Sequence, residues 1–341
     1  MINFNKIKKS VAIAGIGVVL LASASCIIDP TTAQKSSSEV YQQSINAVVM
    51  IQNDPPSSMG TGFFIDENVI VTNYHVVEGM TNVIVYADSS NAPYHAEVLH
   101  SSPYHDISIL RIKDWDDFKA TADWNALTIS DEDPNIGDIA YTLGHPWGVY
   151  WTFSTGIISG TKRRAPGSVG GEVLFHQTDA NMFEGNSGGP LLNVDGDVIG
   201  INSRIQLGNG GSHAYAIPGV IANKVIYDFL TYSKTNVPKL GVNLGYSDEW
   251  EIDVEAFAST DSPAEKACGL SEGDIILRIK KETTVDQYDN ETTYDFVDVG
   301  ISADLIYFIQ KLNLDEGAIV MEIKNQYDGT IENKSCTIQR P

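Results

Sequence analysis

The sequence predicts a mainly β protein in which two consecutive β-barrels are followed by a smaller α+β domain. Between about Val40 and Tyr232, short alternating apolar runs are broken by Gly, Pro, Asn and Asp, a pattern typical of a pair of all-β barrels. Val237-Pro238 then marks a domain boundary, after which a new pattern of strands and one helix begins. A chain of 341 residues with 43% hydrophobic residues is long enough to bury two cores.

The chain begins with a segment that has the features of an export signal. Three lysines within the first nine residues precede an apolar run at 11–21 and small residues at 22–25. We therefore expect residues 1–28 to be a signal peptide or a membrane anchor. Three alternatives stay open: ordinary cleavage after the small residues, lipidation of Cys26 in a segment similar to a lipobox, and no cleavage. The polar residues 29–39 are predicted to form a linker.

The apolar runs predict the strands of the two barrels. They lie at 47–52, 62–65, 69–72, 83–86, 107–112, 140–143, 191–194 and 198–202. Asp195-Gly196, between the last two runs, predicts a hairpin turn. Residues 219–232 change to a helical periodicity, and we expect this helix to close a domain that spans 40–237.

The charge and the cysteines limit the environment and the partners. The chain has 44 acidic and 22 basic residues, and its formal net charge is −22. Such a surface repels phosphate backbones and anionic lipid headgroups, which disfavours nucleic-acid binding. Cys268 and Cys336 would lie in an oxidising compartment and could pair, but sequence alone does not place their Cα atoms within bonding range.

The most informative motif is the glycine-rich turn Gly185-Asn186-Ser187-Gly188-Gly189-Pro190. Its glycines permit positive φ angles and let a substrate carbonyl approach the backbone closely. Ser187 is therefore a candidate nucleophile, and the amides of Gly185 and Ser187 are candidates for an oxyanion hole. The same pattern also fits a nucleophile elbow of another hydrolase fold or an ordinary turn.

A nucleophilic serine needs a base and a third group that orients the base. His75 follows the apolar run at 69–71, and Asp106 directly precedes the alternating run at 107–112. The chain order His75, Asp106, Ser187 is the order of chymotrypsin and differs from those of subtilisin and the α/β-hydrolases, which disfavours the elbow. His95, His100 and His105 have a spacing of five that fits no single face, so we predict no metal site.

Several motifs, all in the same order, resemble those of the HtrA (Deg) family of trypsin-like serine proteases. TNYHVV, HDISIL and QTDANMFEGNSGGPL are similar to the family's His, Asp and Ser boxes. TLGHPWG and STGIISG resemble the segment between the Asp and Ser boxes, and AYAIP resembles the last strand of the protease domain.

The resemblance implies a trypsin-like double β-barrel protease domain at 40–237 and a PDZ domain at 238–341. It implies that His75, Asp106 and Ser187 are catalytic. Three further residues, which would form the strand that pairs with substrate, are Asn202, Ser203 and Arg204. The loop that would hold a peptide carboxylate on the PDZ domain, by β-augmentation, is Leu240, Gly241 and Val242. The helix beside that groove would span 302–312.

The resemblance also implies partners and a location. The substrates would be unfolded or damaged exported proteins or peptides, with no cofactor, in the bacterial cell envelope. The chain would be secreted or tethered to the membrane through its N-terminus. The assembly would be a homotrimer, for which Tyr41 is the candidate aromatic contact. A regulatory protease that cuts one membrane partner is an alternative, and an intact triad disfavours a non-catalytic chaperone or peptide-binding module.

The sequence departs from the family pattern at four places. Phe183-Glu184 replaces Asn-Pro before the nucleophile turn, and we expect Glu184 to face water because a carboxylate pointing inward would oppose an oxyanion. His145 stands where Asn is more usual, and Arg204 replaces a small residue. The acidic insert at 280–300 is either a long solvated hairpin or a cover over part of the PDZ groove.

Overall fold

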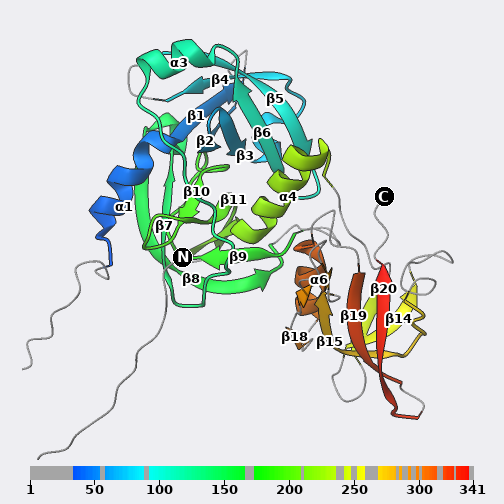
Figure 1. Ribbon diagram of the computed structural model, residues 1–341. Helices are drawn as coiled ribbons and strands as arrows, with labels where there is room; N and C mark the ends of the chain where they lie inside the picture. The colour runs from blue at the N-terminus through cyan, green and yellow to red at the C-terminus, as the bar shows by residue number, and fades with distance from the viewer. Residues whose placement is uncertain are drawn as a thin grey trace, which may run out of the picture. The chain divides into compact units, whose positions relative to one another are not determined.

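The computed structural model (Figure 1) describes residues 34–53, 58–87, 92–165, 173–208, 211–235, 242–246, 252–257, 268–281, 284–285, 291–292, 297–298, 302–312, 318–325 and 328–337. The predicted export segment, Cys26, the boundary at 237–238, Leu240 and Gly241 lie outside these residues. Within the described ranges, no helix is both long and apolar enough to cross a membrane.

The described chain opens with a capped helix. Helix α1 (Ser37–Ser44) and the 3-10 turn η2 (Ile45–Ala47) lead into the first barrel. Ser36 caps α1 by accepting a hydrogen bond from the Glu39 amide, while the Glu39 carboxylate accepts one from the Ser36 amide. The predicted linker at 29–39 is therefore wrong at its end, because this reciprocal cap starts a helix within a polar run. Tyr41 on α1 packs edge-on against Phe153 at 5.5 Å between ring centroids.

The first barrel is a closed antiparallel sheet with the strand order β1-β2-β3-β6-β5-β4. Its strands are β1 (Val48–Asn53), β2 (Met59–Asp66), β3 (Val69–Thr72), β4 (Asn82–Tyr86), β5 (Tyr94–Ser102) and β6 (Ile107–Ile112). The short helix α2 (Tyr74–Val77) follows β3, and α3 (Trp115–Thr121) follows β6. The predicted strands at 69–72 and 107–112 are confirmed to the residue.

The second barrel is also closed, with the strand order β10-β11-β12-β9-β8-β7. Its strands are β7 (Ile139–Gly144), β8 (Thr152–Arg163), β9 (Phe175–Thr178), β10 (Pro190–Leu192), β11 (Val198–Gly208) and β12 (Gly211–Pro218). The 3-10 turn η3 (Pro146–Gly148) follows β7, and α4 (Gly219–Tyr232) follows β12 with the bounds that the sequence predicts. The predicted turn is confirmed, since Gly196 has a φ of 84° and its amide donates to the Asn193 carbonyl.

One apolar core joins the two barrels. It contains Phe63, Val71 and Ile109 of the first barrel together with Leu143 and Ile201 of the second. Buried side chains from both barrels are therefore in one continuous cluster, which fixes loops of one barrel against loops of the other. The predicted pair of barrels is confirmed, and their junction is where the candidate site forms.

The C-terminal part forms a separate sheet with its own core. The strands β13 (Val242–Tyr246), β14 (Ile252–Phe257), β15 (Ile275–Lys281), β19 (Ala318–Lys324) and β20 (Ile331–Thr337) follow that order, and β18 (Val297–Asp298) pairs with β15. Helix α6 (Ser302–Gln310) contributes Leu305 and Ile309 to this core. Within the insert, β16 (Thr284–Val285) pairs with β17 (Glu291–Thr292), which favours the hairpin alternative.

Cys268 lies in this C-terminal core and forms a disulfide bond. The other two cysteines of the chain, Cys26 and Cys336, are at positions where the structure describes no side chain. The pairing of Cys268 with Cys336 therefore stays a prediction.

Candidate active site

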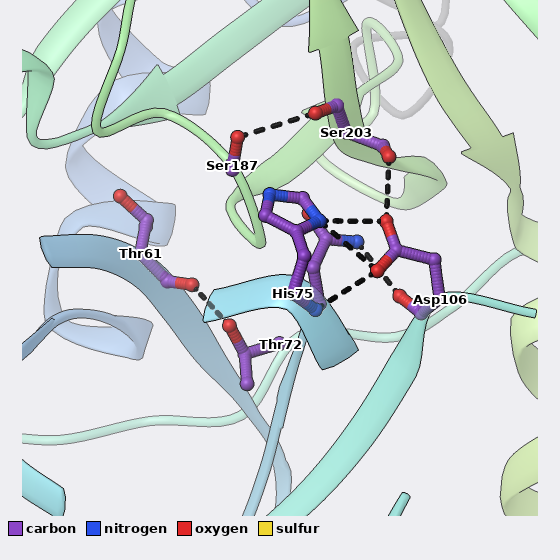
Figure 2. Close-up of polar contacts among 7 residues, drawn as sticks. Thr61, Thr72, His75, Asp106, Ser187 and Ser203 are labelled. Carbon is purple, nitrogen blue, oxygen red and sulfur yellow. Dashed lines mark hydrogen bonds and ion pairs between the residues drawn. The ribbon is translucent and has the colours of Figure 1, made fainter. Parts of the chain in front are cut away.

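The first barrel supplies a histidine held by an aspartate (Figure 2). His75 lies on α2, directly after β3, and its Nδ1 is 3.0 and 2.9 Å from the two carboxylate oxygens of Asp106. The backbone amide of His75 also donates to Asp106 Oδ1 at 3.0 Å. Because a carboxylate accepts from Nδ1, that nitrogen carries the proton and Nε2 is left with a free lone pair. The pair can therefore act as an oriented base.

Asp106 has an unusual backbone conformation for this task. Its φ is 54°, in the left-handed region that a non-glycine residue seldom adopts. The side-chain amide of Asn73, a buried residue, donates to the Asp106 carbonyl at 3.0 Å. This bond ties Asp106 to the residue that precedes α2, so one side chain fixes both the end of β3 and the start of β6.

The second barrel supplies the serine. Ser187 lies in the turn before β10, and its Oγ donates to the Ser203 carbonyl at 3.2 Å. Among the described residues this is its only hydrogen bond as a donor, so the hydroxyl is turned toward β11 rather than bonded to His75. Such an alignment is common before substrate binds, and a rotation about χ1 changes it.

Two backbone amides of the nucleophile turn, those of Gly185 and Ser187, are free to donate. In each case the carbonyl of the same peptide unit is hydrogen-bonded and points the other way. The Glu184 carbonyl accepts from the Trp147 amide at 2.9 Å, and the Asn186 carbonyl accepts from the Gly189 amide at 3.0 Å. A trans peptide is planar, so the following amides of Gly185 and Ser187 point in the opposite directions. Neither amide has an acceptor among the described residues. Two free donors on one turn are what an oxyanion hole requires.

Gly185 must be a glycine at this turn. Its φ is 102°, and a Cβ there would lie 2.5 Å from the His145 carbonyl. A side chain would therefore both strain the backbone and push away the η3 segment that holds the Glu184 carbonyl. The conformation of the two free amides thus depends on this glycine.

Thr61 of β2 connects the two barrels behind the turn. Its amide donates to the Ser187 carbonyl at 2.8 Å, and its Oγ1 donates to the Gly185 carbonyl at 2.7 Å. The same Oγ1 accepts from the His145 amide at 3.1 Å, and the Thr61 carbonyl accepts from Thr72 Oγ1 at 2.7 Å. One fully buried residue therefore fixes two carbonyls of the nucleophile turn. Thr61 stands in none of the sequence motifs that mark the candidate catalytic residues.

The structure gives Ser203 a contact that the sequence did not predict. A bulge between Asn202 and Arg204 interrupts the pairing of β11 with β12, and it directs Ser203 Oγ to Asp106 Oδ2 at 2.8 Å. The Asp106 carboxylate thus accepts from the His75 side chain, the His75 amide and the Ser203 hydroxyl. Only tertiary structure could reveal this bond, since 97 residues separate its partners.

Asn202 and Arg204 are placed differently from Ser203. Asn202 is fully buried, its amide and carbonyl bond to Gly189 and Gly188, and its side chain donates to the Pro190 carbonyl at 3.0 Å. These groups of Asn202 support the nucleophile turn, and its place in the strand that pairs with substrate stays a prediction. The Arg204 guanidinium lies 5.5 Å from the centroid of the Phe175 ring.

Two departures from the family pattern can now be placed. Glu184 is exposed, as the sequence analysis expects. His145 is buried beside Tyr150 and Trp151, and burial lowers its pKa from 6.5 to about 3, so it is neutral at pH 7. In the part of the chain that the structure describes, no three His, Cys, Asp or Glu side chains gather as metal ligands.

The comparisons with known proteins agree with this geometry. Residues 60–201 match the model of the trypsin-like peptidase domain. A probable periplasmic serine endoprotease DegP-like from Marinomonas sp. (strain MWYL1) is 31% identical over 307 residues, which are 84% of this chain and 59% of that protein. The serine endoprotease DegS of Haemophilus influenzae is 29% identical over 71% of this chain and 72% of its own length.

A similar solved structure covers nearly the whole chain. The HtrA-type protease AlgW with tripeptide has a TM-score of 0.67 and 25% identity, over 90% of this chain and 97% of its own. Against the DegP-like proteins the coverage is smaller, since the chain spans 59% of the Marinomonas relative and 45% of one from Chlamydia muridarum.

Proposed function

We propose that this chain, which belongs to the HtrA (Deg) family of trypsin-like serine proteases, is a serine endopeptidase of the bacterial cell envelope. The observation that carries the proposal is the meeting of three features at the junction of the barrels. An oriented His75–Asp106 pair, the Ser187 hydroxyl and two amides without acceptors all lie at one place. Acyl transfer by a serine uses all three, as the base, the nucleophile and the donors to the oxyanion.

In this mechanism Ser187 Oγ attacks the scissile carbonyl while His75 Nε2 takes the hydroxyl proton. The carbonyl oxygen becomes an oxyanion that accepts hydrogen bonds from the Gly185 and Ser187 amides. His75 then gives the proton to the leaving amine, and the C–N bond breaks to leave an acyl-enzyme. Water attacks the acyl-enzyme with the same base, which releases the acid and restores Ser187. Asp106 stabilises the imidazolium throughout.

Substrate binding can align the serine. The Ser203 carbonyl, which accepts from Ser187 Oγ, is at the bulge of β11 beside the nucleophile. An extended substrate has a backbone N–H that needs an acceptor at this position, and Ser203 offers one. When the substrate amide occupies that carbonyl, the Ser187 hydroxyl loses its acceptor and turns to His75 Nε2. Residues Ser203 and Arg204 would thus border the acyl side of the substrate.

The rest of the proposal concerns substrates and partners. We infer that the substrates are unfolded or damaged exported proteins, and that the protease domain covers 40–237. Residues 238–341 would form a PDZ domain in which Leu240, Gly241 and Val242 hold the carboxylate of a peptide. A homotrimer and attachment to the membrane through the N-terminus, by Cys26 or by an uncleaved anchor, complete the proposal. The relatives named as periplasmic support the location. A regulatory protease with one membrane partner is the alternative.

The experiment is the digestion of denatured casein, with mass-spectrometric mapping of the cuts. Wild type should cut at many sites, whereas Ser187→Ala and His75→Ala should each lose nearly all turnover and the double variant little more, because the groups act as a unit. A fluorophosphonate should label wild type and not Ser187→Ala. Casein cleavage by Ser187→Ala at the wild-type rate would refute the proposal, and one or no cuts by an enzyme that takes the label would favour the regulatory alternative.

A further inference from the structure

Asp106 is the last residue of the turn that joins β5 to β6. Ser102 at the end of β5 pairs with Ile107 at the start of β6, so the turn consists of residues 103–106. Its two backbone hydrogen bonds are long, since the His105 amide is 3.2 Å from the Ser102 carbonyl and the Asp106 amide is 3.3 Å from the Pro103 carbonyl. With a φ of 54° at Asp106 as well, the backbone alone holds this residue weakly.

A side-chain hydrogen bond adds to the hold on this turn. Ser102 and His105 are buried, and Ser102 Oγ is 2.7 Å from His105 Nδ1, which is closer than the atoms of either backbone bond. His105 Nε2 has no hydrogen-bond partner among the described residues. A buried N–H without an acceptor is rarer than an unpaired acceptor, so we assign the proton to Nδ1, which donates to Ser102 Oγ. The imidazole thus ties the end of β5 to the residue before Asp106.

The helix that follows the second barrel packs near this turn. Helix α4 runs beside β6 of the first barrel (Figure 1). Lys224 and Asp228 on α4 are buried, and Lys224 Nζ is 3.1 Å from Asp228 Oδ2. Burial, and after it the positive charge of Lys224, lowers the pKa of His105 from 6.5 to about 3, so the ring is neutral at pH 7. A neutral ring can stay buried with a single hydrogen bond.

The other hydrogen bonds of Asp106 act on different parts of the residue. Asn73 donates to its carbonyl, and Ser203 donates to its carboxylate. The bond between Ser102 and His105 instead holds the chain on the N-terminal side of Asp106. The three bonds therefore do not replace one another.

We propose that His105 is a positioning residue for Asp106, because its bond to Ser102 keeps the turn at 103–106 in the conformation that presents the Asp106 carboxylate to His75. The inference rests on the proposed function, in which His75 is the base. His105 itself touches neither substrate nor the reacting atoms in this mechanism.

The first test removes the acceptor of His105 Nδ1. Ser102→Ala should lower kcat about tenfold and leave KM within about twofold, because the orientation of the base is changed and substrate contacts are not. Ser101→Ala is the matched control. Ser101 lies one residue earlier on β5, and its Oγ is 2.7 Å from Ser108 Oγ. Its substitution should leave kcat unchanged.

The second test changes the imidazole. His105→Phe keeps a buried ring and loses the donor, so kcat should again fall about tenfold, and adding Ser102→Ala should lower it little further because both changes remove the same bond. His105→Asn keeps an N–H near the place of Nδ1 and should retain most of the rate. If His105→Phe fails to fold, Ser102→Ala, which removes one oxygen atom, decides alone.

A spectroscopic measurement separates positioning from a general loss of stability. The proton on His75 Nδ1 lies between the ring and the Asp106 carboxylate, so its NMR resonance is far downfield and reports on this bond. The resonance should shift or broaden in Ser102→Ala and His105→Phe. It should stay in place in Ser101→Ala.

The outcomes separate the inference from the proposed function. Cleavage that depends on Ser187, with wild-type kcat and an unshifted resonance in Ser102→Ala and His105→Phe, would overturn the inference and leave the proposed function intact. A fall in kcat without a change of the resonance would also overturn it, since His105 would then support the fold alone. If wild type shows no cleavage or fluorophosphonate labelling that depends on Ser187, the proposed function is lost, while the resonance still shows whether His105 positions Asp106.

Discussion

The two halves of the candidate site are held in opposite ways. On the first barrel, the groups that would react are themselves bonded, since His75 and Asp106 share three contacts. On the second barrel, the reacting groups have no acceptor or a replaceable one, and the carbonyls behind them are bonded instead. A base must keep one tautomer and one orientation, whereas an oxyanion hole must keep its donors free for the substrate. Hydrogen bonds between the reacting groups themselves orient the base. Hydrogen bonds to the carbonyls of the nucleophile turn fix the oxyanion hole while its amides stay free.

The largest effect on kcat should come from removing the hydrogen bonds between His75 and Asp106. Asp106→Asn places an amide where the carboxylate accepts from His75, which favours the wrong tautomer of the imidazole. We expect kcat to fall about 10⁴-fold with little change in KM. Steady-state kinetics on a casein-derived peptide measure this. A loss below about tenfold would show that the orientation of His75 does not depend on Asp106.

The second-largest effect on kcat should come from removing the hydrogen bond that holds the Gly185 carbonyl of the nucleophile turn. Thr61→Val keeps the shape of the side chain but removes the bond to the Gly185 carbonyl. We expect kcat to fall about 10- to 100-fold, somewhat less than the loss of a direct donor. Thr61→Ser should restore most of the rate.

Thr178→Val is the matched control for Thr61→Val. Thr178 is also fully buried, and its hydroxyl donates to the Ile157 carbonyl at 2.7 Å on β9 and β8. Both valine variants should lose stability by about 1–3 kcal/mol, since Thr61→Val leaves the Gly185 carbonyl without its hydroxyl donor and Thr178→Val leaves the Ala180 amide without its acceptor. Only Thr61→Val should slow the chemistry. Equal kcat values in the two variants would mean that Thr61 supports the fold alone.

A smaller effect is expected at Ser203, which bonds to both halves. Ser203→Ala removes one donor from the Asp106 carboxylate and keeps the carbonyl that faces Ser187. A hydrogen bond to a charged group contributes about 1.5–3 kcal/mol, and because two donors to the Asp106 carboxylate remain, we expect a loss at the lower end of this range, about 10-fold in kcat. Ser108→Ala, a buried serine on β6 bonded to Ser101, should leave kcat unchanged. An unaltered kcat in Ser203→Ala would show that the bond from Ser203 is not needed to orient the Asp106 carboxylate.

The smallest effect on activity, and a distinct effect on stability, is expected at His145. Burial lowers the pKa of His145 and of His105 from 6.5 to about 3. Between these values the unfolded chain binds more protons than the folded one, so stability falls as the pH decreases below 6.5. Each histidine should cost about 2 kcal/mol between pH 7 and pH 5.

His145→Asn, which introduces the residue more usual in the family, should remove one of these two losses. We expect the acid-induced decrease in the free energy of unfolding to be about 2 kcal/mol smaller than in wild type, measured by urea denaturation at the two pH values. The kcat at pH 7 should stay within about twofold, because His145 is neutral there and the substitution keeps its backbone amide bond to Thr61 Oγ1 at 3.1 Å, while the longer contact of its Nδ1 with the same oxygen, at 3.4 Å, is lost. The same pH dependence in both proteins would show that His145 does not titrate in this range.

Secondary structure was predictable where burial follows a simple period. Strands β3 and β6 and helix α4 bury apolar side chains at regular intervals, and their predicted bounds are confirmed. Strand β5 was missed because only Ala96 and Ser102 of its residues are buried, so it shows no apolar alternation. Strand β9 was missed because it is short and Phe175 is its one large apolar residue. Pairing with neighbouring strands, which a local pattern does not record, forms both.

The sequence by itself determined the fold class and nominated His75, Asp106, Ser187 and the glycine turn, because each stands in a local motif with its own chemistry. Only the tertiary structure decided how these groups are supported. The bonds from Ser203 to Asp106 and from Thr61 to Gly185 join residues 97 and 124 positions apart. Serine and threonine hydroxyls are common and carry no motif, so their partners depend on how the two barrels pack. The same packing brings helix α4, which follows the second barrel, against β6 of the first.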